Sequence, residues 1–194
     1  QHLNQSLGLQ GQHQINLESA PAQAGQIQVN SLQPELPWNG IYHGGCPVTT
    51  KALPRKGFIF SHWSSPRPAY NNRKADSIEV AVNTNTTLIA HFDSCHNVIS
   101  TSISASEHLL RGTTQPPLPG ARYEWTTGGH IVSTDSVIYN PTSGRYDLTV
   151  YYDSCEISAP VFSLEKEDYR VRLFPNPTTS SIQVQFLQTS IEDL

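Results

Sequence analysis

The sequence predicts an all-β protein built from small domains, and three observations lead to this fold class. Short segments in which apolar and polar residues alternate recur along most of the 194 residues, as they do in half-buried strands. Clusters of Gly, Pro, Asn and Asp separate these segments, which is typical of turns. Only 14% of the residues are charged, and the pattern favours two small domains and a tail over one large domain.

The composition argues against two kinds of binding partner, nucleic acid and a membrane interior. The formal net charge of −4 comes without a basic patch, so we expect no nucleic-acid partner. No apolar run reaches the length of about 18 residues that a membrane-spanning helix needs, so we expect no membrane span. The chain opens at Gln1 without a basic and apolar leader. We therefore expect a fragment or a mature form, with any signal peptide upstream.

Residues 1–24 are expected to be the end of an upstream module or a linker. The segment is polar and rich in Gln, and Gly8 and Gly11 interrupt its apolar pattern. A short strand is expected to begin at residues 14–17, before the Ala- and Pro-rich spacer at residues 20–24.

Residues 25–94 are predicted to form a first β-domain. The glycine-rich segment 38–45 predicts a turn or a hairpin, and the polar stretch 64–74 predicts a loop. The expected strands alternate at a period of two, and they lie at residues 26–30, 47–52, 57–63, 77–82 and 87–92.

Residues 95–165 are predicted to form a second domain, a β-sandwich. A proline-rich loop is expected at residues 113–120, with turns at residues 126–129 and 140–144. Short strands separated by turns at this spacing indicate a sandwich of two sheets. They are expected at residues 98–105, 122–125, 131–132, 136–139 and 145–152.

Residues 166–194 predict a strand, a rigid corner and a second strand. Val171 and Leu173 alternate with polar residues before the corner, and residues 182–186 alternate after it. At the corner, Pro175 and Pro177 fix φ and lack an amide donor, so the first strand must stop there.

The corner motif Phe174-Pro175-Asn176-Pro177 resembles the opening of the C-terminal sorting domain that the type IX secretion machinery reads. The resemblance implies a secreted or cell-surface protein attached to the outer membrane, with that machinery as a partner. Such sorting domains continue for several more strands, whereas this chain reaches Leu194 after two. It is therefore expected to carry a truncated sorting domain.

The first domain holds Pro47-Val48-Thr49, Gly57-Phe58-x-Phe60-x-x-Trp63 and Leu88-x-Ala90-x-Phe92 in that order. This series resembles a divergent internalin-B-type B-repeat, a small β-module of bacterial surface proteins. The resemblance implies a core built from Phe58, Phe60, Trp63, Ala90 and Phe92. The lead-in at residues 25–42 is similar to the version that follows CotH-type kinase domains in large secreted proteins. That similarity implies a kinase-like upstream domain, and the chain itself holds no kinase motif.

The second domain holds Tyr123-x-Trp125 and, later, Gly144-x-Tyr146-x-Leu148-x-Val150. This combination resembles the immunoglobulin-like or PKD-like domains of extracellular proteins. The resemblance implies that Trp125 packs in the core and that Tyr146 lies on a long late strand.

Two of the three cysteines close a similar phrase, Phe92-Asp93-Ser94-Cys95 and Tyr152-Asp153-Ser154-Cys155. We predict a Cys95–Cys155 disulfide that encloses the second domain and persists in an oxidising exterior. Closing a loop of that size stabilises by about 4 kcal/mol on the chain-entropy model. A Cys46–Cys95 bridge is the rival pairing, because spacing alone does not fix connectivity.

Candidate chemistry is sparse along the chain. His91, Cys95 and His96, with His43 and Cys46, match no closed zinc pattern, so we expect no metal and no cofactor. Asp93 and Asp153 lie at equivalent strand ends and are expected to be solvated rather than paired in a cleft. The sequence has no nucleophile elbow, P-loop or His-Glu-x-x-His motif. We therefore predict no catalytic residues and no enzyme activity in this segment.

Aromatic side chains offer one route to binding. Trp38 and Tyr42 lie in or beside the expected turn and are candidates for stacking on the sugar rings of a surface glycan. The prediction for function is a non-catalytic accessory region that provides spacing, display, secretion and attachment for an upstream domain of the same protein. The alternative is a glycan- or protein-binding accessory module.

Overall fold

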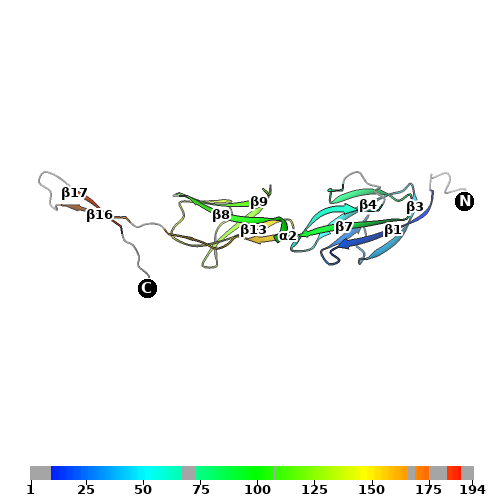
Figure 1. Ribbon diagram of the computed structural model, residues 1–194, viewed down its shortest axis with the longest axis horizontal. Coiled ribbons are helices and arrows are strands. Elements are labelled where there is room, and N and C mark those ends of the chain that lie inside the picture. The colour runs from blue at the N-terminus through cyan, green and yellow to red at the C-terminus, as the bar shows by residue number, and fades with distance from the viewer. Residues whose placement is uncertain (1–9, 67–72, 107, 166–168, 175–182, 189–194) are drawn as a thin grey trace.

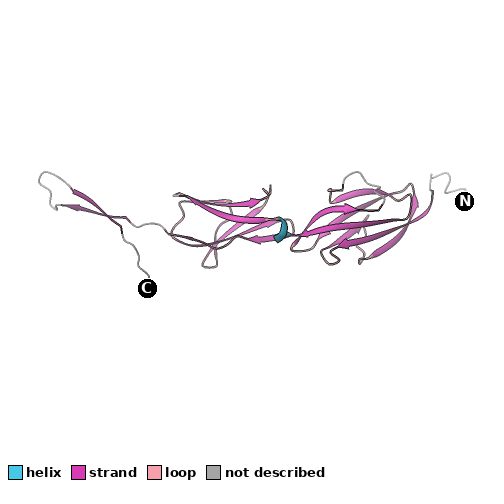
Figure 2. Ribbon diagram, in the orientation of Figure 1, coloured by secondary structure: helices cyan, strands magenta, loops and turns pink. Residues whose placement is uncertain are grey.

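The computed structural model describes residues 10–66, 73–106, 108–165, 169–174 and 183–188. Strands dominate the described chain (Figure 2), and its single described helix is the short α2, Cys95–Val98. The all-β fold class is confirmed. Two β-domains lie end to end along the long axis of the molecule, with α2 between them (Figure 1). No helix in the described ranges is long and apolar enough to cross a membrane.

The first domain is a sandwich of two sheets. One sheet has the order β3-β1-β7-β5 and the other has the order β2-β4-β6. β1 pairs in parallel with β7, and every other pairing in this domain is antiparallel. The strands are β1 Gln10–Ala20, β2 Gly25–Val29, β3 Trp38–Gly44, β4 Pro47–Pro54, β5 Phe58–Ser64, β6 Ser77–Ala81 and β7 Thr86–Ser94.

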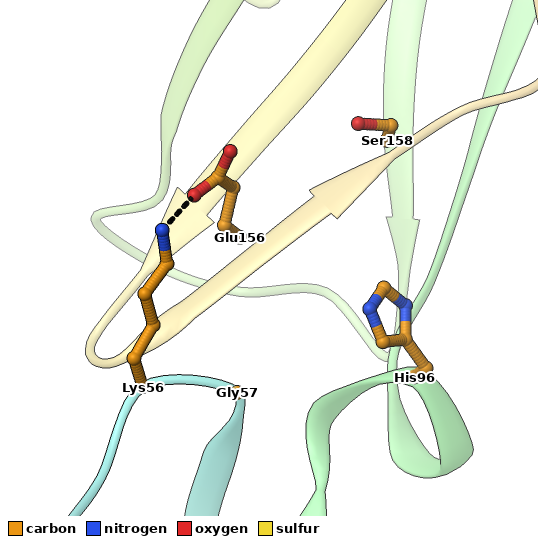
Figure 3. Close-up of a pocket in the computed structure, with 5 residues that line it drawn as sticks. All are labelled: Lys56, Gly57, His96, Glu156 and Ser158. Atoms are coloured by element: carbon orange, nitrogen blue, oxygen red, sulfur yellow. Dashed lines mark ion pairs between the residues drawn. The ribbon is translucent and has the colours of Figure 1, made fainter.

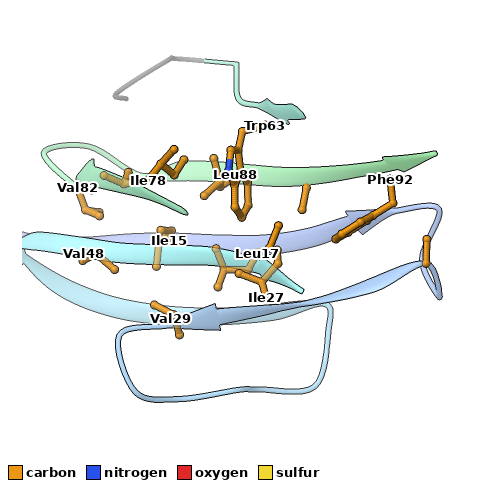
Figure 4. Packing of buried hydrophobic residues seen from close by; sticks show 14 residues of the cluster. Ile15, Leu17, Ile27, Val29, Val48, Trp63, Ile78, Val82, Leu88 and Phe92 are labelled. Atoms are coloured by element: carbon orange, nitrogen blue, oxygen red, sulfur yellow. The ribbon is translucent and has the colours of Figure 1, made fainter. Parts of the chain in front are cut away.

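The core of this domain lies between the two sheets, which face each other with alternate side chains (Figure 4). Trp63 is fully buried, and its indole Nε1–H donates to the carbonyl oxygen of Ala75 at 2.9 Å. Ala90 and Phe92 are also buried, while Phe58 and Phe60 are partly buried and pack against the same cluster. The five positions expected to form the core therefore do so.

Two expectations for the first domain are wrong. Residues 10–20 belong neither to an upstream module nor to a linker, because they form β1 in the middle of a sheet of the first domain, with Ile15 and Leu17 fully buried; the strand expected at residues 14–17 lies within β1. Residues 38–44 form the edge strand β3 rather than a turn or a hairpin, because they pair with β1 along its length. Gly40 permits this strand, since a Cβ there would lie 2.2 Å from Cη2 of Trp38.

The second domain is also a two-sheet sandwich, as predicted. One sheet has the order β11-β10-β13-β14, with β15 joining β13, and the other has the order β12-β9-β8. Its strands are β8 Ser100–Ser106, β9 Leu109–Gln115, β10 Arg122–Thr127, β11 His130–Ser133, β12 Val137–Tyr139, β13 Gly144–Tyr152, β14 Cys155–Ser158 and β15 Phe162–Leu164.

The expected roles of the two aromatic residues in this domain are confirmed. Trp125 is fully buried and its Nε1–H donates to the carbonyl oxygen of Asp135 at 2.8 Å. Tyr146 lies on the long strand β13, and its hydroxyl donates to the carbonyl oxygen of Thr142 at 2.9 Å. Both belong to a buried cluster of Leu110, Trp125, Tyr146, Leu148 and Val150.

The expected loop at residues 113–120 is partly wrong, because β9 extends to Gln115. Leu110 is buried on the inner side of this strand, two residues before Gly112. A Cβ on Gly112 would lie 2.6 Å from Cδ2 of Leu148 and 3.2 Å from Cζ2 of Trp125. A glycine in the middle of a strand here marks a close approach of neighbouring side chains rather than a turn.

The tail forms a hairpin of β16 Tyr169–Phe174 and β17 Gln183–Gln188. The two strands are antiparallel, with Tyr169 opposite Gln188 and Phe174 opposite Gln183. The predicted order of strand, corner and strand is therefore confirmed at the two strands. Pro175, Asn176 and Pro177 of the proposed sorting motif lie outside the described residues.

Candidate functional site: the joint between the two domains

Three short segments meet where the two domains join. The first domain contributes the β4–β5 turn at residues 55–57, and the second contributes the two-residue β13–β14 turn, Asp153 and Ser154. The third segment is helix α2, which directly follows β7 and lies between the two domains. Only residues 95–99 separate β7 from β8, so the linker is short and mostly helical.

The joint is closed by the Cys95–Cys155 disulfide, which confirms the predicted pairing over the Cys46–Cys95 rival. It links the first residue of α2 to the first residue of β14, with Cα atoms 5.7 Å apart and a sequence separation of 60 residues. Both cysteines are at least 98% buried. Cys46 is a free, half-buried thiol in the first domain.

Backbone hydrogen bonds join the same segments. The amide of Cys95 donates to the carbonyl oxygen of Gly57 at 2.9 Å, and the amide of Gly57 donates to the carbonyl oxygen of Ser154 at 3.0 Å. The Ser154 hydroxyl donates to the carbonyl oxygen of Phe58. Gly57 has a φ of +88°, a value that favours glycine. One glycine of the first domain thus contacts both the linker and the second domain.

A small apolar cluster lies around the disulfide. Cys95, Ile99, Cys155 and Ile157 are buried, and Ile59 of the first domain packs against them together with Leu118 of the second. Burial of apolar side chains from both domains opposes their separation, because opening the joint would return this surface to water.

A pocket of about 360 Å³ opens at the joint, lined by Lys56, Gly57, His96, Glu156 and Ser158 (Figure 3). Within it, Lys56 Nζ lies 2.7 Å from Glu156 Oε2, so an ion pair also connects the domains. The hydrogen bond to Glu156, and then its charge, raise the pKa of Lys56.

The pocket does not assemble the metal-ligand group that we considered from the sequence. His96 lines it, but Cys95 is in the disulfide and His91 lies on β7 of the first domain. Among the residues that the structure describes, no group of three or more His, Cys, Asp and Glu side chains could hold a metal ion. Asp93 and Asp153 are both exposed.

Sequence reasoning missed a histidine pair on the first domain. His62 on β5 is opposite His91 on β7, and their rings stack with centroids 4.4 Å apart. Ser64 Oγ lies 2.7 Å from His91 Nε2. Desolvation, and then the charge of His62, lower the pKa of His91, which Asp93 partly offsets. Only the cross-strand register, with its irregularity between Phe60 and His62, brings these residues together.

The two candidate stacking residues lie on the same face of β3. Trp38 and Tyr42 are half-buried and pack against the first core, and the Trp38 ring lies over Gly40. Burial raises the pKa of the Tyr42 hydroxyl. Each ring therefore has a packing role, and sugar stacking stays a prediction. Titration of Trp38→Ala with cell-surface oligosaccharides checks it.

Comparison with known proteins gives one family. Residues 16–95 match the family described as Divergent InlB B-repeat domain. A crystal structure of a DUF3823 family protein from Parabacteroides merdae matches at 9% identity and a TM-score of 0.24, over 80% of this chain and all of that one. No curated protein matches. The first domain, which begins in β1 and reaches the joint at Cys95, is thus similar to a bacterial surface-type β-domain.

Proposed function

We propose that this chain is a non-catalytic accessory region that holds an upstream domain at a fixed distance from the attachment point of a secreted or cell-surface protein. The observation that carries the proposal is the joint. A disulfide ties the linker to the second domain. Three hydrogen bonds and an ion pair join the first domain to the linker or to the second domain. A flexible tether would need none of these contacts, whereas a stiff spacer needs contacts of this kind across its joint.

The remaining parts of the proposal come from the sequence resemblances. The tail motif supports export by the type IX secretion machinery, and the second domain is similar to immunoglobulin-like and PKD-like modules. The lead-in at residues 25–42 supports a CotH-like kinase as the upstream domain. Replacing Asn176 with Ala in the parent protein tests the export step. Surface display that is unchanged by Asn176→Ala would remove the sorting motif from the proposal.

Small-angle X-ray scattering of the full chain tests the spacer. The wild-type profile should fit one extended arrangement of the two domains, as in Figure 1. The variant Cys95→Ser/Cys155→Ser with Ser154→Ala should require a mixture of bent arrangements. Cys46→Ser is the matched control, because this free thiol is not part of the joint. A wild-type profile that already requires such a mixture would contradict the proposal.

A further inference from the structure

The first and last strands of the first domain are parallel neighbours. β1 pairs with β7 through six residue pairs, from Ile15 opposite Thr86 to Ala20 opposite His91. β1 begins at the end of the domain that is distant from the joint, and β7 runs into the joint (Figure 1). The chain therefore enters one end of the domain on β1 and leaves the other end on β7.

This arrangement determines how the first domain resists a stretching force applied to its two ends. Tension draws β1 toward the N-terminus and β7 toward the joint, so the two strands must slide past each other. When the strands slide, all the hydrogen bonds of the β1–β7 ladder carry the force at the same time, so they must break together. When two strands are peeled from one end, the bonds break one after another and each needs little force.

Several contacts hold β1 in place besides the ladder to β7. Its other edge pairs with β3, so the strand is held on both sides. Ile15 and Leu17 are fully buried in the core. The amide of Gln14 donates to Asn85 Oδ1 at 2.9 Å, which ties β1 to the turn that precedes β7. Sliding β1 out of the sheet would break all of these contacts.

The second domain transmits tension by a different route. A pull that arrives through β7 reaches Cys95 and crosses the disulfide directly to Cys155 on β14. The residues between the two cysteines, which include most of the sandwich, are bypassed. Only the short segment from residue 156 to residue 165 can then be drawn out of this domain.

From these observations we propose that the chain is a tension-bearing tether, in which the β1–β7 ladder is a shear clamp and the Cys95–Cys155 bond is a covalent bypass. The inference rests on the proposed function for one point, that the chain is attached at both ends. It adds a mechanical role that a stiff spacer does not require.

Single-molecule force spectroscopy on the full chain, with handles at both termini, tests the bypass. At about 3.5 Å per residue, residues 10–94 of the first domain have a contour length of roughly 300 Å, and unfolding should lengthen the oxidised chain by this amount less the distance that the folded domain already spans. The second domain should add no more than about 35 Å. In Cys155→Ser an extra lengthening of roughly 210 Å should appear, and the control Cys46→Ser should not show it. The same lengthening in the oxidised chain would overturn the bypass.

The clamp is tested by changing the direction of the pull in one protein. A handle at the exposed Thr84, in the turn before β7, and a second at the N-terminus should peel β1 from β7 from the pair of Ile15 and Thr86 onward. This geometry should open the first domain at a much lower force than pulling from the two termini. Equal forces would overturn the clamp. They would leave the stiff spacer intact if scattering still shows one extended arrangement, so the two proposals fail separately.

Discussion

The two β-domains reach stability by different means. Among the residues that the structure describes, the core cluster of the first domain has 14 buried residues and the one between the sheets of the second has five, and only the second domain is closed by the Cys95–Cys155 disulfide. A small core rarely stabilises a domain alone, and a covalent link that restricts the unfolded chain compensates for it. Packing should therefore determine the stability of the first domain, and the disulfide should determine that of the second.

The largest expected effect concerns the core of the first domain. Trp63→Ala should lower the free energy of unfolding of that domain by about 3–5 kcal/mol, because it removes the largest fully buried side chain and leaves the carbonyl of Ala75 without its indole donor. Chemical denaturation followed by amide hydrogen exchange can assign the loss to this domain.

The matched control for this substitution is Ile41→Ala. Ile41 lies on β3 of the same sheet and is 70% exposed, so its truncation should change stability by no more than about 0.5 kcal/mol. Equal losses for Trp63→Ala and Ile41→Ala would contradict the view that packing stabilises this domain.

Next in size is the effect of the disulfide on the second domain. Cys95→Ser/Cys155→Ser should destabilise residues 100–164 by about 2–4 kcal/mol while the unfolding midpoint of the first domain changes little. Reduction of the wild type in denaturant provides an independent route to the same state. If the first domain lost as much stability as the second, the proposed division between packing and covalent closure would be wrong.

The turn at the joint should show a smaller effect. Gly57→Ala places a Cβ on a residue with a φ of +88°, which costs about 1–2 kcal/mol. No atom of any residue beyond its two chain neighbours lies within 4 Å of that Cβ position, so the loss is due to the backbone alone. Lys56→Ala is the control, because it removes an exposed ion pair and leaves the turn intact. Equal thermal unfolding midpoints for the two variants would exclude backbone strain at Gly57.

The smallest expected effect is a dependence on pH in the first domain. Because the pKa of His91 is lowered in the folded state, the unfolded chain takes up this proton at a higher pH than the folded domain does. The stability that neutral His91 contributes is therefore present above its unfolded pKa of about 6.5 and is lost as the pH falls below that value.

Thermal unfolding of the first domain at a series of pH values measures this dependence. His91→Gln should flatten the curve, whereas His130→Gln on the exposed strand β11 should leave it unchanged. A pH dependence that persists in His91→Gln would assign the effect to another group.

The sequence predicts those elements whose signal lies within a short stretch of neighbouring residues. Alternation between Gly144 and Tyr152 indicates β13, and the core position of Trp125 follows from its motif. The strand expected at residues 14–17 lies within β1, but its length and its place in the first domain were missed, because its partner β7 is about 70 residues away and pairs with it in parallel. A single sequence shows no trace of such a pairing. β9 was missed because it contains Gly112, a residue type that is common in turns. In the structure this glycine instead leaves room for the side chain of Leu148.

The joint was only half predictable. The repeated phrase that ends at Cys95 and Cys155 indicates the disulfide, but its two copies adopt different structures. Asp93 and Ser94 end the strand β7, whereas Asp153 and Ser154 form a two-residue turn. The role of Gly57 depends on where the second domain lies against the first, which no local pattern in the sequence contains. For the same reason, the stacked pair of His62 and His91 becomes visible only once the register of two strands is known.

If the joint fixes the two domains relative to each other, two points on opposite sides of it should keep one distance. Pulsed electron paramagnetic resonance, with spin labels at the exposed positions Glu79 of β6 and Arg145 of β13 in a Cys46→Ser background, measures the distance across the joint most directly. A rigid joint predicts one narrow distance distribution, which broadens when Cys95→Ser/Cys155→Ser and Ser154→Ala are added. A broad distribution in the intact chain, unchanged by those substitutions, would contradict the claim.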